Sequence, residues 1–225
     1  QISVSSGYTT IYLQTGYVRN TGLELSLGYG HTWNNNFRWD SNFTLSHNKN
    51  KIKELVRDYV HPETGELINK DRLDVGGLGK ARFILKEGGT LGDLYTQSDL
   101  KRDDNGMVDI DPTGIVAIEN NLPDIKLGSV FPKANLAWSN HFSWKGISLS
   151  ALFTARIGGI VYSATEAAMD QYGVSERSAL ARDNGGVLVN NRTLVDAQNY
   201  YTTIGSESGL PQYYTYNATN VRLQE

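Results

Sequence analysis

The sequence predicts an all-β protein, part of a large antiparallel transmembrane β-barrel with long extracellular loops that carry short helices. Two hairpins alternate apolar and polar side chains over strands long enough to cross a bilayer, which takes about 9–11 residues. Each hairpin closes through a short turn. The segments that follow the hairpins run for about 80 and about 60 residues, far above the usual loop median of roughly 4–6. Short turns at one side and long loops at the other are typical of outer-membrane barrels.

The first hairpin covers residues 21–46, with Asn34-Asn35-Asn36 as a turn of residues that tolerate left-handed backbone angles. Its first strand places on one face Leu23, Leu25, Leu27, Tyr29, His31 and Trp33, and on the other Glu24, Ser26, Gly28, Gly30 and Thr32. Its second strand places Phe37, Trp39, Ser41, Phe43 and Leu45 opposite Arg38, Asp40, Asn42, Thr44 and Ser46. One face is therefore apolar and the other unusually polar.

The second hairpin covers residues 134–157 and turns at Trp144-Lys145-Gly146. The apolar face of its first strand carries Leu136, Trp138 and Phe142, with Asn140 as an exception. The return strand alternates Ile147, Leu149, Ala151, Phe153, Ala155 and Ile157 with Ser148, Ser150, Leu152, Thr154 and Arg156. Both hairpins have aromatic residues beside the turn, as expected at a membrane–water interface.

The two long segments contain local structure of their own. The first extends from about Lys49 to Lys133, and residues 81–95 predict a small hairpin within it. The second extends from about Gly158 to Asn217, where Ala164–Tyr172 and Ser175–Arg182 predict short helices. We found no internal repeat of fixed period.

Composition excludes several classes of protein. The 225 residues include no Cys, which excludes a disulfide framework and a thiolate metal site. The formal net charge of −3 argues against a nucleic-acid-binding surface, which needs a concentrated positive field. The sequence contains no run of 18 apolar residues, so it predicts no transmembrane helix.

Several short motifs occur in order along the chain. Residues 16–25 (GYVRNTGLEL) contain a G-x-x-x-N-x-G-x-E pattern, and residues 37–39 with 43–51 contain an F-x-W and N-x-N-K pattern. These patterns resemble the corresponding stretches of the SusC/RagA family of TonB-dependent outer-membrane transporters. Further matches, in order along the chain, are Gly92-Asp93-Leu94-Tyr95, Leu122-Pro123, the hairpin at 138–146 and residues 218–225 (ATNVRLQE). Each motif alone is weak, and the ordered set is the more specific observation.

The resemblance implies a domain organisation and a function. Residues 1–225 would be part of a receptor β-barrel of about 22 strands, with the plug and the final strands absent from this chain. The protein would import oligosaccharides or oligopeptides across the outer membrane of a Gram-negative, Bacteroidetes-like bacterium. A SusD-like surface lipoprotein would be its partner, and energy would come from the TonB complex through segments not in this chain. No cofactor and no enzymatic activity are expected.

Two groups of residues are candidates for contact with the transported molecule. On the polar face, the candidates that would line the lumen are Glu24, Arg38, Asp40 and Arg156, which would either form an ion-pair lining or touch the substrate. In the second long segment, the candidates are Tyr200, Tyr201, Tyr213 and Tyr214, because aromatic rings stack on sugars. The alternative for these tyrosines is packing against a lid protein or neighbouring loops.

Other constellations point to no chemistry. The Asp103–Asp111 acidic stretch lacks the glycine and terminal Glu of the known calcium loop, so it reads as a solvated turn. Residues 76–80 (GGLGK) lack the spacing of a phosphate-binding loop. The alternatives to an active importer are a passive porin, a siderophore-type TonB-dependent receptor, and a soluble β-rich glycan-binding module or glycan-cleaving enzyme. An upstream plug sequence, or a need for detergent, would distinguish these.

Overall fold

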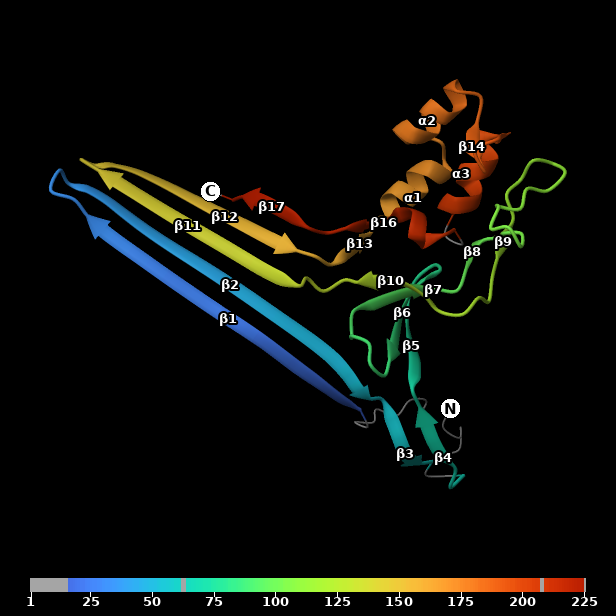
Figure 1. Cartoon of the computed structure of the whole chain (residues 1–225), viewed down its shortest axis with the longest axis horizontal. Helices are drawn as coiled ribbons and strands as arrows, with labels where there is room; N and C mark the ends of the chain where they lie inside the picture. The colour runs from blue at the N-terminus through green and yellow to red at the C-terminus, as the bar shows by residue number, and fades with distance from the viewer. Residues whose placement is uncertain (1–15, 62–63, 207–208, 225) are drawn as a thin grey trace, which may run out of the picture.

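A computed structural model describes residues 16–61, 64–206 and 209–224 of the chain. Its centre is a five-stranded antiparallel sheet in the order β1-β2-β11-β12-β17 (Figure 1). The bounds of these strands are β1 Tyr17–Thr32, β2 Phe37–Glu54, β11 Ala134–Trp144, β12 Ile147–Ile157 and β17 Asn220–Leu223. The all-β prediction is confirmed. Within the described residues the sheet is open, with β1 and β17 at its edges, so a closed barrel of about 22 strands stays a prediction.

Both predicted hairpins are present, and their turns lie at the same end of the sheet (Figure 1). Asn36 has a φ of 63°, as the asparagine turn required. Lys145 and Gly146 have φ values of 46° and 86°, which is the two-residue turn that matches the twist of the flanking strands. Trp144 pairs with Phe37 across β11 and β2, which places the two turns side by side.

The first hairpin is longer than its alternation predicts. β1 and β2 stay paired from Thr32 and Arg38 as far as Tyr17 and Glu54, so the first long segment begins after residue 54 rather than at Lys49. Residues 46–51 (SHNKNK) are polar on both faces, and both faces of this part of the sheet can be solvated. Periodicity reports only the part of a strand that has one face away from water.

The first long segment, called loop one (residues 55–133), folds into small sheets. Its strands are β3 Val56–Val60, β4 Leu67–Lys70, β5 Arg72–Leu78, β6 Ala81–Lys86, β7 Asp93–Thr96, β8 Asp99–Leu100, β9 Ile118–Glu119 and β10 Ile125–Ser129. The predicted hairpin at 81–95 is confirmed by antiparallel pairing of β6 with β7, and both belong to a four-stranded sheet in the order β10-β7-β6-β5.

The second long segment, called loop two (residues 158–219), contains the helices. Its elements are β13 Ile160–Tyr162, α1 Ala164–Gln171, α2 Glu176–Asp183, β14 Val187–Val189, β15 Thr193–Val195, α3 Ala197–Gly205, a 3₁₀ turn at Pro211–Tyr214 and β16 Thr215–Asn217. The two predicted helices are confirmed, and Ser163 and Ser175 cap their first turns. α3 was not predicted, because its sequence AQNYYTTIG is made mostly of weak helix formers.

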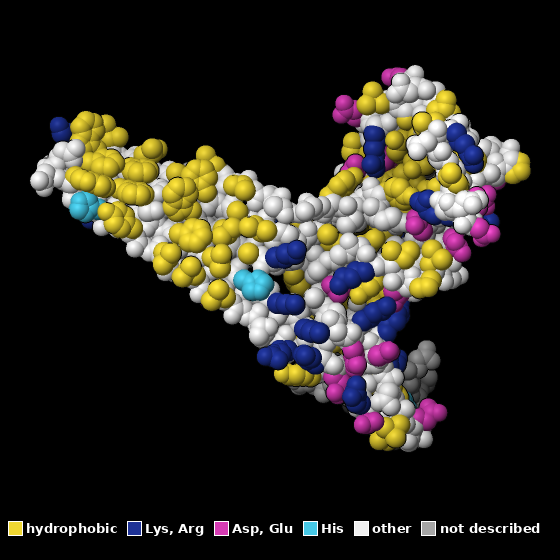
Figure 2. Space-filling view, in the orientation of Figure 1, with side chains coloured by type: hydrophobic (Ala, Val, Ile, Leu, Met, Phe, Trp, Pro, Cys, Tyr) yellow, Lys and Arg dark blue, Asp and Glu magenta, His cyan; other side chains and the backbone are white. Residues whose placement is uncertain are grey.

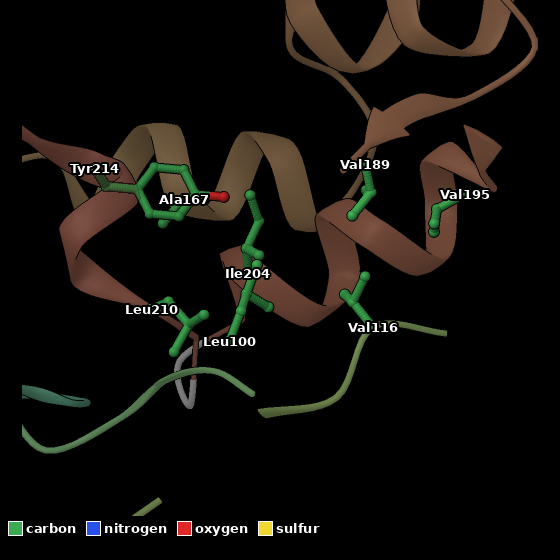
Figure 3. Packing of buried hydrophobic residues seen from close by; sticks show 8 residues of the cluster. All are labelled: Leu100, Val116, Ala167, Val189, Val195, Ile204, Leu210 and Tyr214. Carbon is green, nitrogen blue, oxygen red and sulfur yellow. The ribbon is translucent and has the colours of Figure 1, made fainter. Parts of the chain in front are cut away.

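A cluster of buried apolar residues lies between the two loops (Figure 3). Loop one supplies two of its residues and loop two the other six: Leu100, Val116, Ala167, Val189, Val195, Ile204, Leu210 and Tyr214. The loops therefore form a packed cap at one end of the sheet (Figure 1). No helix in the described ranges has the length and apolar character needed to cross a membrane.

Candidate transport surface

The central sheet exposes its apolar side chains. Those that are more than half accessible are Tyr17, Leu23, Leu27, Tyr29, Ile147, Leu149, Val221 and Leu223. Figure 2 shows hydrophobic side chains gathered over the strands of the central sheet, while charged side chains gather mostly over the loops. A contiguous apolar surface of this extent is expected to meet lipid or protein.

Aromatic rings form a band beside the turns, as predicted. His31 packs edge-on against Trp33, with ring centroids 4.5 Å apart, so the expected place of His31 among these aromatics is confirmed. Phe142 stacks on Trp39 at 6.0 Å and lies 6.2 Å from Phe37. Rings of this kind suit a membrane–water interface at the turn end of the sheet.

The four charged residues predicted on the polar face fall into two separate groups. Arg38 and Asp40 pair near the turns through two hydrogen bonds of 2.6 and 2.7 Å. Glu24 and Arg156 belong to a single row near the loops, which crosses the sheet as Glu24–Ser46–Asn135–Arg156. With about 4.8 Å between neighbouring strands, Glu24 and Arg156 are roughly 14 Å apart along this row. The Arg38–Asp40 pair therefore fits the ion-pair alternative, and Glu24 and Arg156 do not pair with each other.

The polar row lies in a hollow on the sheet, and a second hollow adjoins it beneath the loops. The residues that line the first include Glu24, Ser46, Asn135, Arg156 and Arg222, together with apolar neighbours such as Leu25 and Leu136. The second lies between the sheet and the loops, and its lining includes Phe83, Ile160 and Tyr162. Arg156, Asn220 and Arg222 line both hollows.

The four candidate tyrosines lie together in the cap, with different exposure. Tyr214 is 1% exposed, and its ring packs within the loop core (Figure 3). Its hydroxyl donates to the Asp170 carboxylate at 2.9 Å. The packing alternative therefore fits Tyr214. Tyr200, Tyr201 and Tyr213 are half-buried against the same core, and contact of these three with a substrate stays a prediction.

A buried carboxylate organises this part of loop two. Asp170 is 1% exposed and accepts hydrogen bonds from Ser175 at 2.5 Å and from the Arg177 guanidinium at 2.7 Å. The guanidinium lies over the rings of Tyr214 and Tyr201, at 4.9 and 5.8 Å from their centroids. Burial raises the pKa of Tyr200 to about 12, so its hydroxyl stays protonated and able to donate.

The acidic stretch of loop one serves turn formation. The Asp103 carboxylate accepts from the backbone N–H groups of Asn105 and Met107 at 2.9 Å each. Asp111 does the same for Thr113 and Ile115, at 2.8 and 3.0 Å. In the described part of the chain, no group of three or more His, Cys, Asp or Glu side chains is arranged to hold a metal ion.

Comparison with known proteins shows that the chain is similar to TonB-dependent receptors. No family model matches the chain. TonB-dependent receptor P26 of Formosa agariphila is 27% identical over 178 residues, which are 72% of this chain and 17% of P26. TonB-dependent receptor P39 of the same organism is 27% identical over 99 residues, 44% of this chain and 8% of P39. The chain thus spans less than a fifth of the length of these relatives.

The fold of the chain is similar to that of solved transporter structures. The RagAB peptide transporter covers 99% of this chain with a TM-score of 0.61 and 19% identity, and the match takes up 24% of the transporter chain. The predicted resemblance to TonB-dependent transporters of the SusC/RagA family is confirmed. A second structure, the RagAB peptide importer in a "closed-closed" state, gives the same TM-score at 18% identity. At this identity the similarity of this chain to the solved structures concerns the fold alone.

Sequence reasoning missed two residues of the polar surface. Arg222 and Asn220 lie on the short strand β17, whose four residues give too little alternation to assign a face. The register resolves this, because Asn220 pairs with Arg156 and Arg222 with Thr154. Both residues therefore share the polar face with Arg156.

Proposed function

We propose that this chain is part of the wall and the extracellular cap of an outer-membrane importer energised through TonB. The observation that carries the proposal is the two-faced sheet, whose apolar side chains are exposed while its polar side chains line a hollow. In a closed barrel the apolar face would meet lipid and the polar face would surround the path of the substrate. The similarity to TonB-dependent receptors supports this function.

The substrate would be an oligopeptide or an oligosaccharide, captured together with a SusD-like surface lipoprotein. The match to a structure named as a peptide transporter supports the peptide class. The size and order of the cap support a partner surface, because segments of this length in compact proteins are usually functional. The importer would move its substrate unchanged, as the similarity to receptors and to a transporter suggests.

Removal of the loop-two cap tests the proposal. Ser163 and Tyr214 are joined by a backbone hydrogen bond of 2.9 Å, directly beyond the paired strands β13 and β16. Residues 163–214 can therefore be replaced by Asn-Gly, which closes Tyr162 and Thr215 into a hairpin without moving the barrel strands. The full-length protein with this excision should insert in the outer membrane and fail to support growth on its peptide or oligosaccharide source.

The matched control keeps the cap and changes only its exposed surface. Leu188 and Leu194 are cross-strand partners on β14 and β15, and each is more than half exposed. A Leu188→Ser, Leu194→Ser variant should keep the barrel and the cap folded, and co-purification of the lipoprotein reports whether this surface contributes to docking. Normal growth and normal co-purification after the excision would contradict a role of loop two in capture.

A further inference from the structure

Arg156 is a half-buried cation, and one of its guanidinium N–H groups has no hydrogen-bond acceptor in the structure. It lies near the end of β12, where the polar face of the sheet meets the loops. One guanidinium nitrogen, Nη2, donates to the backbone carbonyl of Val130 at 2.5 Å. Its Nε is buried and has no hydrogen-bond partner in the structure. A buried guanidinium N–H without an acceptor is costly, so a missing acceptor is indicated at this position.

Arg222 lies next to Arg156 on the same face. Because Asn220 is the direct partner of Arg156, Arg222 is its diagonal neighbour, with Cα atoms about 7–8 Å apart. Neither arginine forms an ion pair with any described residue. The acid of the polar row, Glu24, is three strands away from Arg156. Two cations that have no ion-pair partner among the described residues therefore line one hollow.

Arg38, which also lies on the polar face, differs from Arg156 and Arg222 because it has a carboxylate partner. Arg38 is paired with Asp40 through two hydrogen bonds, so its charge and its planar fork are already matched within the chain. In the described part of the chain Arg156 and Arg222 have no such partner, and the row of Arg156 continues through the uncharged Asn135 and Ser46. The surplus positive charge is thus local to the hollow at the loop end of the sheet.

We propose that Arg156 and Arg222 bind a carboxylate of the transported molecule as it passes from the cap into the barrel. A carboxylate has two coplanar oxygens that match the guanidinium fork, and it would supply the acceptor that Nε of Arg156 lacks. The inference rests on the proposed import function and narrows its substrate to anionic cargo. The carboxylate could come from a peptide, through its C-terminus or acidic side chains, or from an oligosaccharide that contains uronic acid.

Methyl esterification tests the charge without changing the rest of the cargo. Purified full-length transporter with its lipoprotein is incubated with a tryptic digest of casein, in native and methyl-esterified forms, and retained peptides are quantified by mass spectrometry. A parallel arm uses oligogalacturonides in native and methyl-esterified forms. The wild type should retain the native form preferentially in one arm, which identifies the source of the carboxylate. If native and methyl-esterified cargo are retained equally with both the peptides and the oligogalacturonides, or if neither is retained, the proposal is overturned.

Three variants test whether Arg156 and Arg222 cause the preference for native over methyl-esterified cargo. Arg156→Met and Arg222→Met should each lower the ratio of native to esterified cargo about tenfold, the effect of one lost charge-assisted hydrogen bond. Arg222 is exposed, so Arg222→Met keeps the test valid even where Arg156→Met does not fold. Arg38→Met, on the same face, should leave the ratio unchanged. An unchanged ratio in Arg222→Met and folded Arg156→Met would overturn the assignment. Failure of the importer itself would appear separately, as no growth advantage over a deletion strain on any peptide or oligosaccharide.

Discussion

The indole Nε1–H of Trp39 donates a hydrogen bond of 3.1 Å to the side-chain oxygen of Asn140. Asn140 interrupts the apolar face of β11, and it is 6% exposed. The residue directly opposite it on β2, Ser41, accepts in the same way from the indole of Trp138 at 2.9 Å. The two polar residues on the apolar face, Asn140 and Ser41, thus each accept a hydrogen bond from an indole of a neighbouring strand.

Substitution of Asn140 by alanine should destabilise the protein, because the half-buried Trp39 N–H would lose its acceptor. We expect a loss of about 1–3 kcal/mol in the free energy of unfolding. The measurement is urea unfolding of the full-length protein in lipid vesicles, followed by tryptophan fluorescence. The double variant Trp39→Phe, Asn140→Leu removes donor and acceptor together and should recover part of this loss. If Asn140→Ala unfolds at the wild-type urea concentration, the bond contributes nothing.

The sequence predicted the two hairpins and their faces because a two-residue period survives wherever one face avoids water. Asn140 appeared as an exception, and only the register across β2 and β11 identifies its partner. The cap was predicted in pieces. The first two helices have serine caps that can be recognised locally, whereas α3 depends on Ile204 packing against residues of loop one. The separation of Arg38 from Arg156 likewise depends on pairing between distant strands.

The orientation of the sheet in the membrane is tested by arginine substitution on β12. Leu149 is 64% exposed on the apolar face, and Leu149→Arg should cost about 2–4 kcal/mol if the residue lies near the bilayer midplane. Ser150→Arg, on the opposite face, should cost much less, even though Ser150 lies 2.9 Å from a ring nitrogen of His141. Unfolding in lipid vesicles measures both values. Equal losses would contradict the assignment of faces.

The positions of the turns and loops are tested by cysteine labelling of intact cells. Asn105→Cys in loop one and Asp183→Cys at the end of α2 are exposed and should react with an impermeant thiol reagent. Asn34→Cys, in the short turn, should not react until the cells are broken. The described chain has no native cysteine to add background. Labelling of Asn34→Cys in intact cells, with the loop positions protected, would invert the topology.

The order of loop two depends on Asp170. Asp170→Asn would leave the half-buried Arg177 guanidinium with only the more exposed Glu166 as counter-ion, so we expect a local destabilisation of about 1–3 kcal/mol. Hydrogen exchange of α1, α2 and the 3₁₀ turn at Tyr214 measures this effect, while the exchange of β11 and β12 should stay slow. Glu166→Gln is the control, because Glu166 lies 3.6 Å from the same guanidinium and is more exposed. Its cost should be about 0–1 kcal/mol.

Acid should loosen the sheet of loop one through Asp124. The Arg72 guanidinium, hydrogen-bonded to Asp124 at 2.7 and 2.9 Å, holds the pKa of this carboxyl well below its usual value, against the opposing effect of burial. Because the folded pKa is depressed, the stabilisation is present above the unfolded pKa of about 3.9 and is lost as pH falls below it. The hydrogen-exchange protection factors of β5, β6 and β10, which are corrected for the intrinsic pH dependence of exchange, should therefore fall more steeply between pH 5 and pH 2 than those of the central strands. Asp124→Asn should exchange faster at pH 5 and should show a flatter dependence on pH. An Asp124→Asn variant with the wild-type slope would show that this ion pair does not hold the sheet together.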